Sequence, residues 1–158
     1  MKKSFLSLFF CFLFIGLFNI SNGQTIAFKS NQEIEKEIDA AFMKSIKAAE
    51  SLDVPKLINA VDDSRHAGFI ANDNFYSEFE ELANILKSRE PGSVKQTITV
   101  QKKKITVLAE NIALVTASGI SQIEINGGNP FSLNFFWTFV YEKINNEWKV
   151  IQSHQSSK

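Results

Sequence analysis

The stretch that decides the fold is PFSLNFFWTFVYEKI, residues 130–144. Its apolar residues recur at every second position, which is the period of a β-strand rather than of a helix. One face of this predicted strand is apolar along its whole length, with Phe131, Leu133, Phe135, Trp137, Phe139 and Tyr141. The other face carries Phe136 and Val140, so we expect both faces of the strand to contact other groups.

The segments on both sides of this stretch show the same alternation. It predicts further strands at residues 95–109, 112–125 and 148–155. Short turns rich in Asn, Gly and Glu separate the strands, at residues 110–111, 126–129 and 145–147. Long strands joined by short turns predict a consecutive antiparallel meander of four strands.

Before residue 94 the apolar spacing is helical. A first helix is predicted over residues 32–51, because Ser30 and Glu33 form a capping box and an apolar line follows at intervals of four. That line consists of Ile34, Ile38, Phe42 and Ile46. Asp53 is expected to cap a short second helix that has Pro55 in its first turn.

A third helix is predicted to begin with a capping box at Ser77–Glu80 and to stop before Pro91. Between the second and third helices, residues 67–70 and 74–76 predict a small hairpin. Helices followed by strands favour the α+β class, with three N-terminal helices packed on one face of a four-stranded meander.

Residues 1–23 have the three parts of a secretory signal: an N-terminal Lys pair, an apolar run over residues 5–18, and small or polar residues before Gln24. The run is shorter than the ~20 residues of a membrane-spanning helix. Cys11 lies inside the run, not at its end, where a lipid anchor would need it. We therefore expect a secreted or periplasmic protein without a membrane anchor, made of a short segment (residues 24–30) and one domain (residues 31–158).

Composition excludes several classes of function. Without residues 1–23 the chain keeps 15 basic and 17 acidic residues and no cysteine. A nearly neutral surface gives no electrostatic basis for binding nucleic acid. The sequence has no dinucleotide fingerprint, phosphate-binding loop or nucleophile elbow. Its two histidines, His66 and His154, lie far apart without a metal-ligand spacing, so neither a metal nor a cofactor is predicted.

The last strand, EWKVIQSHQS at residues 147–156, resembles the W-x-[IV]-x-x-x-H-x-S ending of the NTF2-like superfamily. The order of three helices, hairpin and meander is also similar to that superfamily, and more narrowly to its SnoaL-like and DUF4440-like members. The resemblance implies a cone in which the sheet wraps the helices and leaves a pocket at the open end. It also implies a homodimer formed through the outer face of the sheet.

Three candidate catalytic residues follow from this resemblance and from residue chemistry. His154 matches the terminal-strand histidine of the superfamily and is expected to face the pocket. Asp63 and His66 could act with it as general acid and base. The alternatives stay open: a histidine satisfied by backbone or water at His154, and solvated surface groups at Asp63 and His66. Tyr76, Trp137, Phe42 and Phe139 are the candidate ligand contacts.

Three functions remain after the sequence analysis. The first is binding of a small, mostly apolar molecule in the cone, and the second is an isomerase, dehydratase or cyclase of the SnoaL-like kind. The third is a non-catalytic dimeric interaction module. No aspartate follows Val94, which argues against the ketosteroid isomerase mechanism. The residue types of a scytalone dehydratase are present in Tyr76, Tyr141, His66, His154 and Asp63.

Overall fold

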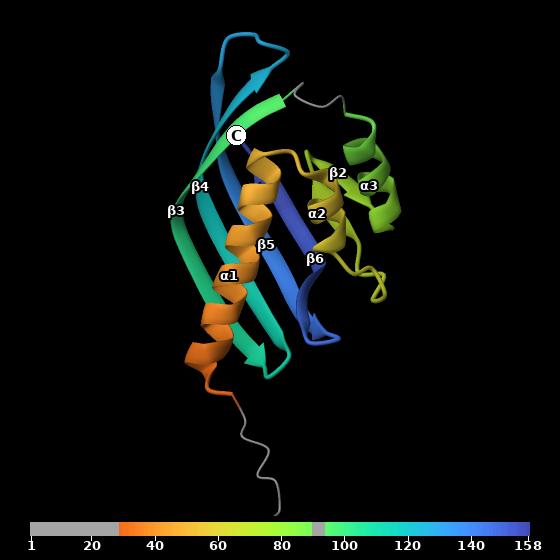
Figure 1. Cartoon of the computed structure of the whole chain (residues 1–158), viewed down its shortest axis with the longest axis vertical. Coiled ribbons are helices and arrows are strands. Elements are labelled where there is room, and N and C mark those ends of the chain that lie inside the picture. Colours follow the sequence, from red (N-terminus) through yellow and green to blue (C-terminus); the bar gives the residue numbers. More distant parts are fainter. Residues whose placement is uncertain (1–28, 90–93) are drawn as a thin grey trace, which may run out of the picture.

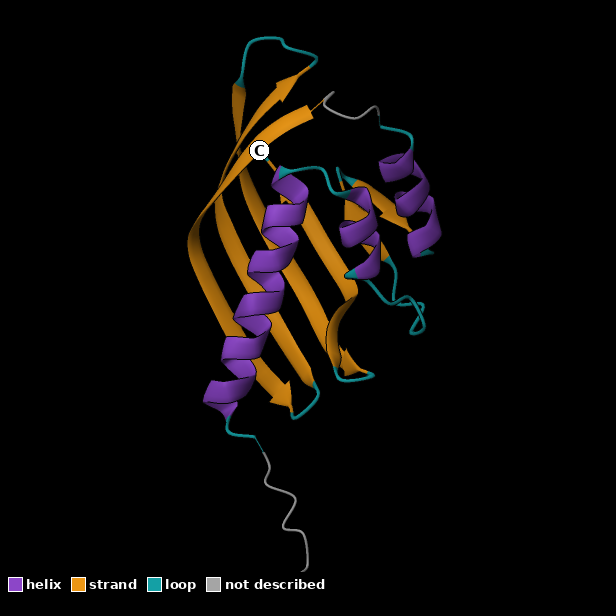
Figure 2. Cartoon of the chain, viewed as in Figure 1, coloured by secondary structure: helices purple, strands orange, loops and turns teal. Residues whose placement is uncertain are grey.

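The structure, a computed structural model, describes residues 29–89 and 94–158 (Figure 1). The predicted signal and residues 24–28 of the short segment lie outside the described residues. In the described part, a long helix, α1 (Asn31–Glu50), lies across the concave face of a curved sheet. Two shorter helices, α2 (Val54–Asn59) and α3 (Phe79–Lys87), cover the neighbouring part of the sheet (Figure 2).

Helix α1 begins at the predicted capping box. The Ser30 hydroxyl accepts a hydrogen bond from the Glu33 amide at 3.3 Å, and the Ser30 amide donates to a Glu33 carboxylate oxygen at 2.9 Å. The apolar line of the helix is buried in the core together with inward residues of the sheet. None of the described helices is both long and apolar enough to cross a membrane.

The sheet contains the four predicted meander strands at nearly the predicted bounds. They are β3 (Val94–Ala109), β4 (Ile112–Ile125), β5 (Phe131–Ile144) and β6 (Glu147–Ser157), each antiparallel to the next. The predicted α+β class is confirmed, and the sheet is curved, as the resemblance implied.

The predicted hairpin is part of the same sheet, which corrects the expectation of a four-stranded sheet with a separate hairpin. Its strands are β1 (Phe69–Ala71) and β2 (Asn74–Tyr76), joined by a turn in which Asn72 and Asp73 have positive φ. Strand β1 pairs in parallel with β6, so the described sheet has six strands in the order β2-β1-β6-β5-β4-β3. Parallel pairing joins segments far apart in the sequence and leaves no local turn signal.

Helix α3 begins differently from the prediction. The box was expected at Ser77 and Glu80, but Glu81 accepts hydrogen bonds from the Glu78 amide at 3.2 Å and the Ser77 hydroxyl at 3.0 Å. A carboxylate oxygen of Asp63 also accepts from the amide of Phe79, the first residue of the helix, at 2.5 Å. The loop after α2 thus helps to cap α3, because the free amides of a first helical turn need acceptors.

Candidate functional site

A cavity of about 390 Å³ lies at the open end of the cone. Its walls come from the C-terminal half of α1, from α3 and from the inner face of the sheet. Strand β5 supplies the longest wall, with Phe131, Leu133, Phe135, Trp137, Phe139 and Tyr141 all lining the cavity. This is the apolar face that its sequence alternation predicted. The volume lies within the range of small-molecule pockets, about 300–1,000 Å³.

The aromatic side chains of this wall hold one another in place. Trp137 stacks on Phe135 with ring centroids 3.9 Å apart and planes 21° apart. Phe139 meets the edge of Trp137 at 6.1 Å and the ring of Phe42 from α1 at 5.9 Å. Such packing holds each ring in one orientation before a ligand binds. Binding therefore costs little side-chain entropy in this wall.

The cavity lining is mostly apolar, and most of its polar groups are neutral Ser, Gln and Asn side chains. Arg89 is the one charged residue among the described lining residues, and no Asp, Glu or His is among them. Burial raises the pKa of Tyr141, and a hydrogen bond with Ser45 acts in the opposite direction. The phenol therefore stays protonated and can donate a hydrogen bond at physiological pH.

Three of the four residues predicted to contact a ligand line this cavity: Phe42, Trp137 and Phe139. Tyr76 is not among the lining residues; it is half-buried on β2 and packs against the hydrophobic core. Whether the three lining residues touch a ligand remains a prediction. The period-two pattern of β5 was the signal that found Trp137 and Phe139, and the four-residue spacing of α1 was the signal for Phe42.

His154 lies on the outer face of the sheet and is exposed, contrary to the expectation that it faces the pocket. Its neighbours Ser153 and Gln155 line the cavity instead. The reason is a bulge in β6: Tyr141 pairs with Val150, and Val140 pairs with Gln152, so Ile151 is an extra residue. One extra residue reverses which side chains point inward along the rest of a strand.

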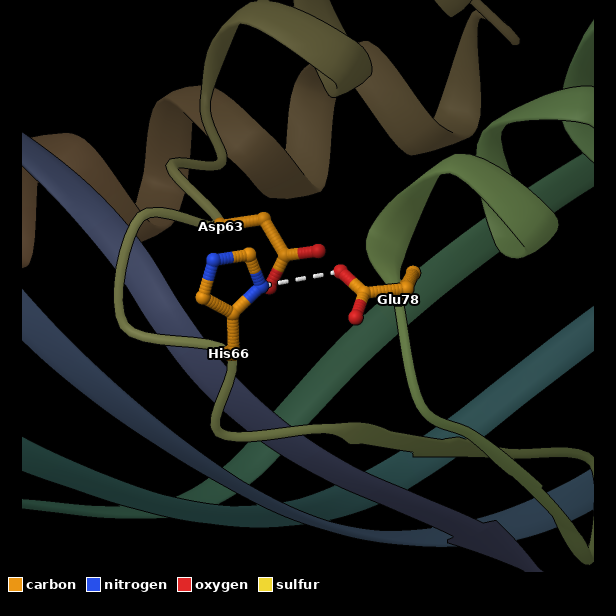
Figure 3. A group of neighbouring side chains, drawn as sticks. All are labelled: Asp63, His66 and Glu78. Carbon is orange, nitrogen blue, oxygen red and sulfur yellow. Dashed lines mark hydrogen bonds and ion pairs between the residues drawn. The ribbon is translucent and has the colours of Figure 1, made fainter.

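Asp63 and His66 do lie together, but they meet Glu78 rather than His154 (Figure 3). Figure 3 shows the imidazole of His66 and the carboxylates of Asp63 and Glu78 turned toward one another, where the loop after α2 meets the start of α3. His66 Nδ1 lies 3.0 Å from Glu78 Oε2, and a hydrogen bond with Glu78 raises the pKa of His66. His66 and Glu78 are exposed.

Sequence reasoning missed Glu78 as a partner of His66. It treated Glu78 only as part of a helix start, and no spacing rule connects it with a loop twelve residues earlier. The three proposed catalytic residues are thus divided between this surface group and the outer face of the sheet. The described cavity lining holds no carboxylate or imidazole, so none of the three lies at the cavity.

The outer face of the sheet is partly apolar. Phe136 is 54% exposed near the middle of β5 and lies opposite Ser118 and Ser156 of the neighbouring strands. Val140 and Leu114 form another pair on this face. We call these residues, with Ile120, the outer patch.

Comparison with solved structures defines the class of fold. An NTF2-like superfamily protein from Salmonella enterica serovar Typhimurium LT2 matches with a TM-score of 0.70 and 17% identity, over 80% of this chain and 92% of that one. A candidate dehydratase of the NTF2-like family from Streptomyces avermitilis matches with a TM-score of 0.67 and 17% identity, over 82% and 99%. At these identities the likeness shows the fold alone, and the predicted NTF2-like fold is confirmed.

A comparison with family models also shows the family of this chain. The model of the calcium/calmodulin-dependent protein kinase II association domain matches residues 35–158, and the chain belongs to that family. The association domain of C. elegans CaMKII has a TM-score of 0.64 and 14% identity, over 79% of this chain and 96% of that one. No curated protein matches the chain in sequence.

Proposed function

We propose that this chain binds a small, mostly apolar molecule in its cone cavity. The observation that carries the proposal is the aromatic wall of β5, which lines a space of about 390 Å³ whose described lining residues include one charged side chain, Arg89. Burial of about 200 Å² of apolar ligand surface would contribute about 5 kcal/mol before the cost of association.

The proposal is tested by narrowing the cavity with Leu133→Trp. The matched control is Asn134→Trp, which places the same residue at the next position, on the exposed outer face. Binding of the uncharged probe N-phenylnaphthylamine, and any molecule retained in native mass spectrometry, should be lost or weakened at least tenfold in Leu133→Trp alone. Equal binding by both variants and the wild type would place the probe outside the cavity and contradict the proposal.

A second candidate function is association with another copy of the chain through the outer patch. Two observations favour it: the exposed Phe136 in the partly apolar outer patch, and membership of a family named for association. A solved relative from Chlamydamonas reinhardtii is described as a CamKII hub homology domain. Large exposed apolar side chains near the centre of a patch are typical of protein interfaces.

Phe136→Glu tests this candidate function, and Phe75→Glu is the matched control. Phe75 is 68% exposed on β2, away from the outer patch. Sedimentation velocity should show a dimer or larger assembly for the wild type and for Phe75→Glu, and a monomer for Phe136→Glu. A monomeric wild type, or dissociation only in Phe75→Glu, contradicts the candidate function.

We also propose that the protein acts outside the cytoplasm, on the support of the signal pattern at residues 1–23. Mass spectrometry of the protein from its own cells should find Gln24 as the first residue. A chain that retains residues 1–23 contradicts the proposed location.

A further inference from the structure

The loop after α2 and Glu78, the residue before α3, bring together one imidazole and two carboxylates. One potential ligand atom from each of Asp63, His66 and Glu78 lies within 4.8 Å of the other two. Within this group, His66 Nδ1 lies 3.0 Å from Glu78 Oε2. In Figure 3 the three groups converge on one small space from two segments of backbone.

Asp63 provides an independent observation that points to a ligand. Its Oδ2 accepts from the Phe79 amide, whereas its Oδ1 is buried and has no hydrogen-bond partner among the described residues. It is the only buried side-chain polar atom without a partner in that part of the chain. A buried carboxylate oxygen without a donor costs free energy, and a cation bound to it would remove that cost.

The neighbouring charged side chains Arg65 and Asp62 have partners outside this group. Arg65 is engaged by Glu142, with two contacts at 2.8 and 2.5 Å. The Asp62 carboxylate accepts from the Ser64 amide at 3.0 Å. The net charge of the group itself is negative, since Asp63 and Glu78 both face one imidazole. The local electrostatics therefore favour a positive ion.

We propose that Asp63, His66 and Glu78 form a three-ligand site for a divalent transition-metal ion of the zinc class. One imidazole nitrogen and two carboxylates are accepted ligands of Zn²⁺, which leaves a fourth position for water. Tetrahedral coordination with bonds of about 2.0–2.1 Å places ligand atoms about 3.3 Å apart. Two of the three groups are on exposed side chains, so this spacing needs only small rotations from the present one.

This site lies outside the cavity and differs from the expectation of no metal. The sequence pattern D-x-x-H followed by a glutamate twelve residues after the histidine is no recognised ligand spacing. The third ligand becomes a neighbour only when α3 docks against the loop. Bound metal would join that loop to α3 and add stability by mass action.

The test uses Zn²⁺ alone, added to chelator-treated protein without an affinity tag and followed by isothermal titration calorimetry. We expect one ion per chain, a higher melting temperature, and at least tenfold weaker binding in both His66→Gln and Glu78→Gln. The matched controls are His154→Gln, which removes the chain's other histidine, and Glu80→Gln in the first turn of α3. Neither control should change the affinity.

Several outcomes would overturn the metal site. These are no binding of Zn²⁺ at millimolar concentration, binding by His66→Gln and Glu78→Gln as tight as that of the wild type, or loss of binding in His154→Gln. Binding of Mg²⁺ as tight as that of Zn²⁺, and unchanged in His66→Gln, would indicate a diffuse acidic surface. This result would also contradict the proposal. His66→Gln and Glu78→Gln decide the question because both side chains are exposed, whereas Asp63 also caps α3.

Discussion

Gly119 lies on the inner face of β4, beneath the ring of Phe135. A Cβ atom at this position would overlap the carbonyl oxygen of Thr99 and come 2.8 Å from the Phe135 ring. The absence of a side chain therefore lets the aromatic wall of the cavity lie directly on the sheet, next to the bulge between Val100 and Lys102 in β3.

Gly119→Ala should lower the free energy of unfolding by about 2 kcal/mol or more, because an added methyl in a closed position forces the backbone or ring to move. Urea denaturation measures the change. Ser118→Ala, one residue earlier on the outer face, should change stability by less than about 0.5 kcal/mol. Equal stability of Gly119→Ala and the wild type would show that the space beneath Phe135 is larger than described.

His154 shows the limit of sequence reasoning at the residue scale. The terminal-strand motif placed His154 correctly on the last strand, but it predicted the inner face of the sheet, whereas His154 lies on the outer face. The face depends on the extra residue Ile151, and nothing in the residues of β6 alone marks a bulge there. The inner face of β5 was predictable, because the alternation of apolar residues runs unbroken through Phe135, Trp137 and Phe139.

At the scale of elements, α1 is attached to the sheet by a polar contact as well as by its apolar face. Glu37 accepts from Lys143 Nζ at 2.7 Å and from Trp148 Nε1 at 2.9 Å, and it also pairs with Lys29. Hydrogen bonds from Lys143, Lys29 and Trp148 lower the pKa of Glu37 to about 2. The ionised carboxylate thus stabilises the contact of α1 with β5 and β6.

Glu37→Gln should lower the free energy of unfolding at pH 7 by about 1 kcal/mol, allowing for partial exposure. The pKa is lower in the folded state, so the contribution is full above the unfolded value of about 4.5 and is lost as the pH falls toward 2. Urea denaturation between pH 7 and pH 3 should show the variant and wild type converging at low pH. Glu35→Gln, at an exposed position, is the control; a Glu37→Gln deficit that is independent of pH contradicts the assignment.

Element boundaries were largely predictable, and their long-range pairing was not. Alternation and turn residues placed β4 at its observed bounds and β3 and β5 within one residue. The parallel pairing of β1 with β6 and the capping of α3 by Asp63 join distant segments. Such contacts form only when whole elements dock against one another. The docking of α3 against the loop after α2 brings Asp63, His66 and Glu78 together.

For the whole molecule, the cavity and the outer patch lie on opposite faces of one sheet. Trp137 and Phe139 of β5 line the cavity, while Phe136 and Val140 point the other way. A ligand and a second copy of the chain could therefore occupy the two faces at the same time. Because the two sets of side chains lie on opposite faces of one strand, the two proposed functions are compatible.

The most direct test of the central claim, ligand binding in the cone, uses the tryptophan inside the cavity. The chain has two tryptophans, and Trp148→Phe leaves Trp137 as the sole emitter. Titration with N-phenylnaphthylamine should then quench Trp137 emission by energy transfer, with saturation at one probe per chain, and Leu133→Trp should abolish the binding step. Absence of saturable quenching in Trp148→Phe, while Trp137→Phe still shows it through Trp148, would contradict a ligand site in the cone cavity.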